Sequence, residues 1–333
     1  MPDSTIARRH MLGLCGAALT GMLPRRSGQA ALPGTVTLLV PGPEDGGLAR
    51  WSRRMAEGLA RAATSAVSLA PNALGGPDGV TAANRFATAA GPDGRTLLVL
   101  TGAAAQARLV GDPRARFDLS GWPPVCAVQT PALVVGRRPM PLGRGQPLRL
   151  GLGAADAPST AALLALDLLG LAAVPMPGLS PMQAEAALQQ GAVEAIVLQG
   201  SDAQARLATL GARSWFSFDP ATGRDAALAE VPRLFEILSA APAPLLAALR
   251  CAGASASMPA AVVLPSLTPA NLVALWRGAA QRWLEEEARI APADVRLLPG
   301  LDAAPLLTAL SPSAEAMLAY REWLMRRLNW KPS

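Results

Sequence analysis

The sequence predicts an α/β protein built from two lobes, and a repeated order of elements is the main reason. Thr35–Val40 is a short run of β-branched and aliphatic residues, which predicts a buried strand. A glycine-containing loop, 42–47, and a helix at about 48–63 follow it. The same order of strand, glycine-rich loop and helix returns at 66–89 and again from Arg95. This alternation is typical of a parallel sheet flanked by helices, whose ligands bind beyond the carboxyl ends of the strands.

A second alternation after residue 147 predicts the second lobe. Val125–Val135 is a long apolar stretch interrupted by Pro131, and we expect it to be a strand that crosses between the lobes. The Pro/Gly/Arg-rich stretch 137–147 indicates an exposed link before a strand at 148–152. Ser159 or Thr160 is expected to cap the helix that follows. Further strands are predicted at 172–174, 193–198, 215–218 and 260–264, and further helices from 181, at 268–287 and at 313–328.

The first thirty residues have the layout of an export signal. Arg8-Arg9 precedes an apolar run from Met11 to Leu23, and small residues follow up to Ala30, near which we expect cleavage. The paired arginines favour the twin-arginine route, and an ordinary Sec signal with a chance arginine pair is the alternative. The apolar run is too short to span a bilayer, which takes about 20 residues. We therefore expect a periplasmic protein.

Composition and charge narrow the class of ligand. The chain is 51% hydrophobic and 16% charged, which predicts a folded protein, and its 333 residues are enough for two cores. The formal net charge is +6, of which the predicted signal holds +3. The remaining excess is modest, and it favours a small anionic ligand. Because no Lys/Arg stripe with interleaved aromatic residues is found, we do not expect nucleic acid as a partner.

The only histidine, His10, lies in the predicted signal. The mature chain therefore lacks the Ser-His and Cys-His pairs of nucleophilic catalysis and any histidine-based metal site. No inward-facing pair of carboxylates stands out either. We expect neither an enzyme nor a metal or cofactor site. Cys126 and Cys251 remain in the mature chain, and their spacing leaves a disulfide and two buried free thiols both open.

The order of the motifs resembles the substrate-binding receptors of tripartite tricarboxylate transporters, the Bug family. Val40-Pro41, Gly46-Gly47 and Arg53 are similar to the family's first strand, glycine loop and following arginine. Gly91-Pro92-Asp93-Gly94 before Thr96-Leu97-Leu98, Phe117-Asp118 and Pro131–Val135 match further motifs. So do the loop from Gly151 to Ser159, Val174-Pro175, Val231-Pro232 and Thr268-Pro269. The resemblance covers nearly the whole mature chain. One departure is Ala49, where many members have an aspartate, which disfavours ligands that carry an ammonium group.

The resemblance implies a type II periplasmic binding protein, with two α/β lobes that are joined by crossing strands and close on a ligand in the cleft between them. It implies a signal at 1–30, a first lobe at 31–131, a second lobe at 132–255 and a return to the first lobe at 256–333. The implied ligand is a small di- or tricarboxylate or a related organic anion, held by backbone amides and hydroxyls at helix N-termini. The implied ligand-binding residues lie in loops of both lobes: Gly42, Pro43, Gly46, Gly47, Thr101, Gly102, Ser159, Thr160, Gly178, Ser180 and Gln199.

The implied partners are the membrane permease subunits of such a transporter, and we expect the receptor to be a monomer. The alternative is a ligand-sensing or non-transport paralogue of the same fold, with a sensor as its partner. An enzyme reading finds little support. Gly151-Leu152-Gly153-Ala154-Ala155-Asp156 ends in aspartate where a dinucleotide-binding loop needs Gly or Ala. No Gly-x-Ser-x-Gly motif occurs.

Overall fold

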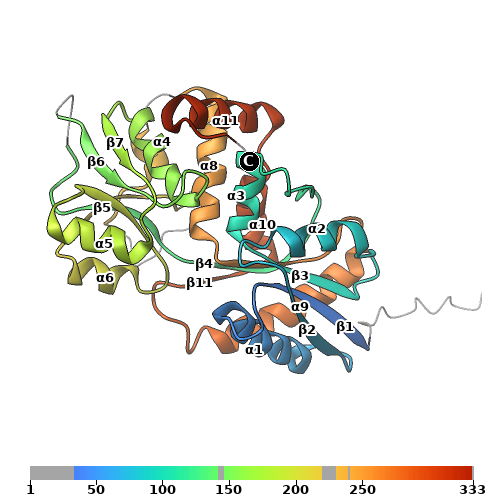
Figure 1. The fold of residues 1–333 in the computed structure, drawn as a ribbon. Coiled ribbons are helices and arrows are strands. Elements are labelled where there is room, and N and C mark those ends of the chain that lie inside the picture. Colours follow the sequence, from blue (N-terminus) through green and yellow to red (C-terminus); the bar gives the residue numbers. More distant parts are fainter. Residues whose placement is uncertain (1–33, 142–145, 220–229, 239–240, 332–333) are drawn as a thin grey trace, which may run out of the picture. The chain divides into compact units, whose positions relative to one another are not determined.

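Two β-sheets with helices on their faces make up the described part of the chain, and each sheet forms the centre of one lobe (Figure 1). The computed structural model describes residues 34–141, 146–219, 230–238 and 241–331. The predicted export signal at 1–30 lies outside the described residues.

The first sheet has the strand order β11-β4-β10-β3-β1-β2. β1 (Thr35–Pro41) lies between β2 (Ser68–Leu74) and β3 (Thr96–Leu100) and pairs with both in parallel. β10 (Ala260–Val263) is antiparallel to β3 and to β4 (Pro124–Gln129), and β11 (Arg296–Pro299) is antiparallel to β4. The first lobe therefore takes strands from two separate parts of the sequence.

Helices cover both faces of this sheet because its side chains alternate between two cores. Leu38 and Leu97 belong to one core, and their neighbours Leu39 and Leu98 belong to the other. The first core is completed by α1 (Gly47–Ala62) and α9 (Ala270–Glu287). The second is completed by α2 (Val80–Ala89), α3 (Gly102–Val110) and α10 (Gly300–Ala309).

The second sheet has the order β7-β6-β8-β5-β9. β6 (Leu148–Gly151) is parallel to β7 (Ala173–Met176) and to β8 (Ala195–Gln199). β5 (Ala132–Gly136) is antiparallel to β8 and to β9 (Arg213–Ser217). α5 (Pro181–Gln190) and α6 (Ala203–Thr209) contribute to the core on one face. The 3₁₀ turn Pro158–Thr160, α4 (Ala161–Leu168), α8 (Ala243–Ser257) and α11 (Ala314–Leu328) lie on the other, and the short α7 (Leu234–Ile237) adds Leu234 there.

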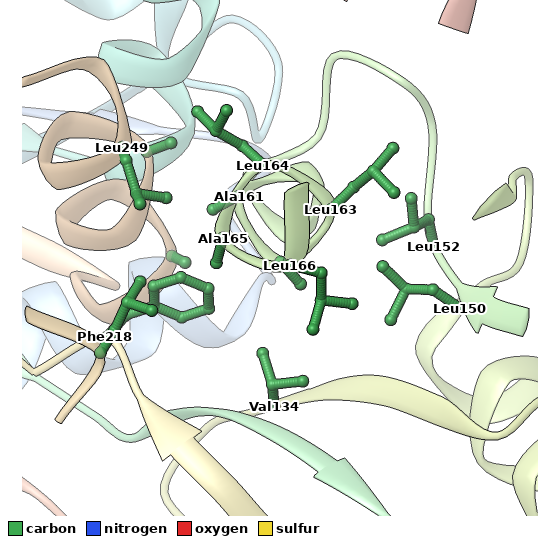
Figure 2. Close-up of a cluster of buried hydrophobic side chains, with 14 of the residues drawn as sticks. Val134, Leu150, Leu152, Ala161, Leu163, Leu164, Ala165, Leu166, Phe218 and Leu249 are labelled. Carbon is green, nitrogen blue, oxygen red and sulfur yellow. The ribbon is translucent and has the colours of Figure 1, made fainter. Parts of the chain in front are cut away.

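The first six residues of α4, Ala161–Leu166, are fully buried, which explains why all six are apolar. Leu163 points toward Leu150 and Leu152 of the second lobe, and Leu164 points toward Leu249 of α8 (Figure 2). A helix packed between a sheet and another helix has no solvent face to fill with polar residues. α4 is thus the packed layer between the second sheet and α8.

The two lobes are joined by covalent crossings and by side chains. The chain passes from β4 to β5 at Thr130–Pro131, and α8 leads into β10. In α11, Arg321 donates to the carbonyl oxygens of Arg108 and Leu109 in α3, at 3.1 and 3.2 Å. Further along the same helix, Arg327 pairs with Asp167 of α4 at 3.0 Å. The C-terminal helix therefore bonds to both lobes.

The structure confirms most of the predicted elements and changes some. Val125–Val135 is not one crossing strand but two strands in different sheets, because Thr130-Pro131 breaks the ladder between them. The predicted capping bond of Ser159 or Thr160 is absent: Thr160 occupies the N-cap position of α4, and its hydroxyl instead donates to Ala154 and Ala155 carbonyls. α6, α7, α8, α10 and β11 had no sequence-based prediction.

Candidate functional site

A cavity of about 850 Å³ is bounded by loops and helix ends from both lobes. The first lobe contributes the β1–α1 loop, the start of α3 and the connection between α9 and β11. The second lobe contributes Pro158 and the end of β8, at Gln199–Ser201. The C-terminal end of α8 forms part of the wall between them. The cavity therefore lies at carboxyl ends of strands of both sheets, where the alternation of elements predicted a ligand.

The N-terminus of α1 opens onto this cavity. The first intrahelical bond of α1 runs from the Arg50 amide to the Gly46 carbonyl, at 3.0 Å. The amides of Gly47, Leu48 and Ala49 precede it, so they have no acceptor within the helix. Gly46 provides no side-chain cap, no acidic residue stands in the first turn, and all three amide-bearing residues line the cavity. Together these amides and the helix dipole form a site for an anion.

The N-terminus of α3 lines the same cavity, but two of its first three amides are bonded within the protein. The Gly102 amide donates to the Met258 carbonyl at 3.0 Å, and the Thr101 hydroxyl accepts from the Ala104 amide at 3.3 Å. The Thr101 hydroxyl also donates to the Asp78 carbonyl at 3.0 Å. Gly102 is required here because a Cβ atom would stand 2.0 Å from the Ser255 carbonyl oxygen. In this structure Gly102 holds α3 against the end of α8, while Thr101 caps α3 and ties it to the loop before α2.

The structure brings only part of the predicted site together. The residues that line the cavity are Gly42, Pro43, Gly46, Gly47, Thr101, Gly102 and Gln199. Gln199 uses its side-chain amide to donate to the Ala256 carbonyl, at 2.9 Å.

Four predicted residues of the second lobe do not line the cavity. Thr160 is fully buried, and the Ser159 hydroxyl accepts from the Gly153 amide at 3.4 Å. Gly178 donates its amide to the Gly153 carbonyl, and Ser180 caps α5 in a reciprocal pair with Gln183. Gly178 and Ser180 follow β7, which is the outermost strand of the second sheet, whereas β8 lies at its centre. A ligand role for these four residues stays a prediction, and it requires a rearrangement of the loops.

The lining has little net charge. Among its described residues, Arg54 and Glu287 are the charged ones, and they pair with each other at 3.4 Å. Arg53, the arginine of the sequence motif, is exposed and lies off the cavity. The positive pole of the cavity is therefore the α1 amide group rather than an unpaired cation.

Sequence reasoning missed one wall of the cavity. Trp51 and Arg54 continue the α1 face that begins at Gly47. Ile290 and Val295 come from the α9–β11 connection, and Leu297 comes from β11. The spacing of 47, 51 and 54 is a helical repeat and was a usable signal. The α9–β11 connection has no comparable signal, because only the fold brings it beside α1.

Other chemistry is not supported by the residues that the structure describes. They contain no cluster of His, Cys, Asp and Glu side chains suited to a metal ion. Within the same residues, no helix is both long and apolar enough to cross a membrane. Cys126 and Cys251 are buried free thiols, and burial raises the pKa of each to about 12. Of the two alternatives that the sequence left open, a disulfide and two buried free thiols, the structure shows the free thiols.

No protein-family model matches the chain, and no curated protein does. A ligand-free TctC solute-binding protein from Polaromonas matches with a TM-score of 0.63 at 17% identity, over 88% of this chain and 98% of that one. Rpa4515 of R. palustris, solved with adipate, matches with a TM-score of 0.54 at 16% identity, over 89% and 98%. MatC from Rhodopseudomonas palustris, solved with bound malate, gives 0.50 at 20% identity, over 87% and 98%.

These matches confirm the predicted fold class. The chain combines two mixed sheets, a crossing at Thr130–Pro131 and a cavity at strand ends. It aligns with nearly the full length of solute-binding proteins. The chain has the two-lobe α/β fold of TctC-type periplasmic solute-binding proteins.

Proposed function

We propose that this chain is an exported receptor that captures a small carboxylate and delivers it to the permease of a tripartite tricarboxylate-type transporter. The fold supports a receptor, and two proteins of that fold are solved with the organic acids adipate and malate. The observation that carries the proposal is the N-terminus of α1, whose three amides without helical acceptors line the cavity.

A carboxylate suits this pole on physical grounds. Its oxygens accept several N–H bonds at once, and such charge-assisted bonds are short and strong. The N-terminal end of a helix carries about half a positive charge, which adds to the attraction. Gly47 leaves room for the ligand to approach the backbone, since no Cβ stands in the way, and Gly46 lets the preceding loop close on Pro43. A neutral or cationic molecule gains none of this.

Delivery requires the receptor to be exported and to close. We assign export to the segment 1–30 and closure to a hinge between the lobes 31–131 with 256–333, and 132–255, except that α11 packs in the core of the second lobe and is assigned to it. Thr130–Pro131 and the end of α8, which leads into β10, are the natural hinge positions, since the chain passes between the two sheets there. In the closed state both lobes would present one surface to the permease.

The test is a ligand screen on the purified protein. Thermal unfolding is measured with di-, tri- and monocarboxylates, and with the neutral amide and the amine of matching carbon skeleton. A carboxylate at about 100 times its Kd should stabilise the protein by about 2.7 kcal/mol. The amide and amine should leave the melting temperature unchanged. If no carboxylate across a broad panel raises it, the receptor proposal is wrong. Uptake of the stabilising carboxylate by cells with and without the chain then tests delivery to a permease.

A further inference from the structure

The amides of Gly47, Leu48 and Ala49 at the N-terminus of α1 form the proposed anion pole, and one face of the helix runs from this pole along the cavity. Gly47, Trp51 and Arg54 all line it, at positions i, i+4 and i+7 of the helix. At a rise of 1.5 Å per residue, Trp51 lies roughly 6 Å from Gly47 along the axis, and Arg54 roughly 10 Å. A ligand anchored on the α1 amides and extended along this face therefore passes the indole first and then reaches Arg54.

The far end of that path offers no free charge for a second carboxylate. Arg54 is already paired with Glu287 at 3.4 Å. The Glu287 side chain is only 13% exposed, so it stays beside the cavity wall, whereas Arg54 is 64% exposed. A carboxylate arriving there meets the carboxylate of Glu287 as well as the guanidinium. Like charges at such distances oppose binding.

The walls along the path are apolar. Trp51 on α1 lines the cavity, as do Ile290 and Val295 on the α9–β11 connection. Leu297 of β11, Val128 of β4 and Met258 complete the apolar lining from the sheet side. Ile290 is 72% exposed although it is a large aliphatic residue. An exposed apolar side chain at the wall of a binding cavity gains stability when a ligand covers it.

On the basis of the proposed function, we infer that the ligand is a monocarboxylate with an extended apolar body. Its carboxylate binds the α1 amides, and its hydrocarbon part lies along Trp51 and the α9–β11 connection. The Arg54–Glu287 pair excludes dicarboxylates of the same length. This distinguishes the chain from the proteins of the same fold that are solved with malate and adipate.

Calorimetry with hexanoate and adipate tests the inference directly, since the two differ only in the group at the far end. Hexanoate should bind at least tenfold more tightly than adipate. Across butyrate, hexanoate and octanoate, affinity should rise by up to about fourfold per methylene until the path is filled. Adipate binding as tightly as hexanoate, or a flat series, overturns the inference while the receptor proposal stands. Failure of every carboxylate overturns both.

A substitution of Glu287 tests whether this residue excludes dicarboxylates. Glu287→Gln removes the competing carboxylate and leaves Arg54 in place, so adipate affinity should rise by about three- to tenfold while hexanoate affinity changes by less than twofold. Glu286→Gln is the matched control, because Glu286 pairs with Arg61 on the same two helices but does not line the cavity. Equal adipate affinity in the two variants contradicts the assigned role of Glu287.

The apolar path is tested at an exposed position, so that folding is not at risk. Ile290→Ser should weaken octanoate by about three- to tenfold and butyrate by less than twofold, because only the longer chain reaches it. Leu301→Ser is the control, since Leu301 is 73% exposed and lies outside the cavity. If Ile290→Ser leaves octanoate binding equal to the control, the ligand does not follow this wall.

Discussion

The variant Gly47→Asp should change carboxylate affinity at the N-terminus of α1 and the stability of the fold in opposite directions. Gly47 is the first residue of α1, its φ angle is not in the left-handed region, and a Cβ there meets nothing closer than Arg50, at 4.0 Å. An aspartate therefore fits. Its carboxylate occupies the place that we assign to the ligand's carboxylate, and it benefits from the same amides and dipole.

The two effects have opposite signs. For folding, an acidic residue in the first turn of a helix contributes about 0.3–1 kcal/mol, so the ligand-free variant should melt about 1–3 °C higher than the wild type. For binding, two like charges about 5 Å apart repel by about 1–3 kcal/mol at effective dielectric constants between those of water and a protein surface. Carboxylate affinity should fall by about ten- to hundredfold.

The assay is thermal unfolding with and without ligand, followed by calorimetry. Gly278→Asp in α9 is the matched control, because it makes the same charge change beside Arg282 and away from the cavity. Gly47→Asn separates bulk from charge, since it adds a similar volume without the carboxylate. If Gly47→Asp binds carboxylates as the wild type does, the α1 amides are not the site. If Gly47→Asn weakens binding as strongly as Gly47→Asp, steric exclusion rather than charge is responsible.

Further expectations concern packing, the thiols and acid stability. Gly102→Ala should lower the free energy of unfolding by about 2–3 kcal/mol in urea titrations, since its Cβ meets backbone, while Gly91→Ala, with open space around it, should change it by less than about 0.5 kcal/mol. Cys126 and Cys251 should not react with a thiol reagent at pH 8 until the protein is unfolded, because burial keeps both thiols protonated at that pH; rapid labelling of the folded protein would contradict this. Hydrogen bonding to Arg149 lowers the pKa of Glu194 below its ordinary 4.5, so its contribution to stability is present above about pH 4.5 and is lost as the pH falls through the folded-state pKa. Glu194→Gln should therefore lower stability slightly at pH 7 and reduce its loss on acidification; the effect is small because both side chains are nearly half exposed, and an unchanged pH profile would show that the pair contributes nothing.

The sequence predicted those elements whose pattern is local. Aliphatic runs followed by glycine-containing loops located β1, β3, β6 and β8, and the helix Val80–Ala89 was placed to the residue. α8 was missed because most of it is buried on all sides, so its Ala/Gly/Ser-rich sequence has no polar face and no clear helical period. α10 was missed for a related reason, since Pro305 lies inside it and argues locally against a helix.

Whether a predicted residue lines the cavity depends on a single loop in one case and on strand order in another. Gly46-Gly47 before a helix identified the α1 pole from neighbouring residues alone. Ser180 follows the same local rule, yet it comes after an edge strand and does not line the cavity. Strand order within a sheet depends on long-range pairing, which a local pattern does not encode. The hydrogen bond from the Gly102 amide, at the start of α3, to the Met258 carbonyl is likewise a long-range contact that a local pattern does not encode.

That contact also explains why the cavity has one strong anion pole rather than two. The amide at the start of α3 donates to the Met258 carbonyl, one residue beyond α8, and the C-terminal turn of α8 faces it closely enough that Gly102 has no room for a Cβ. The positive end of one helix dipole thus meets the negative end of another, and their fields largely cancel at that wall. The same turn of α8 accepts the Gln199 amide from the second lobe. Since α1 meets no such partner, a single carboxylate is drawn to its N-terminus. The rest of a ligand must then be recognised by shape and apolar contact.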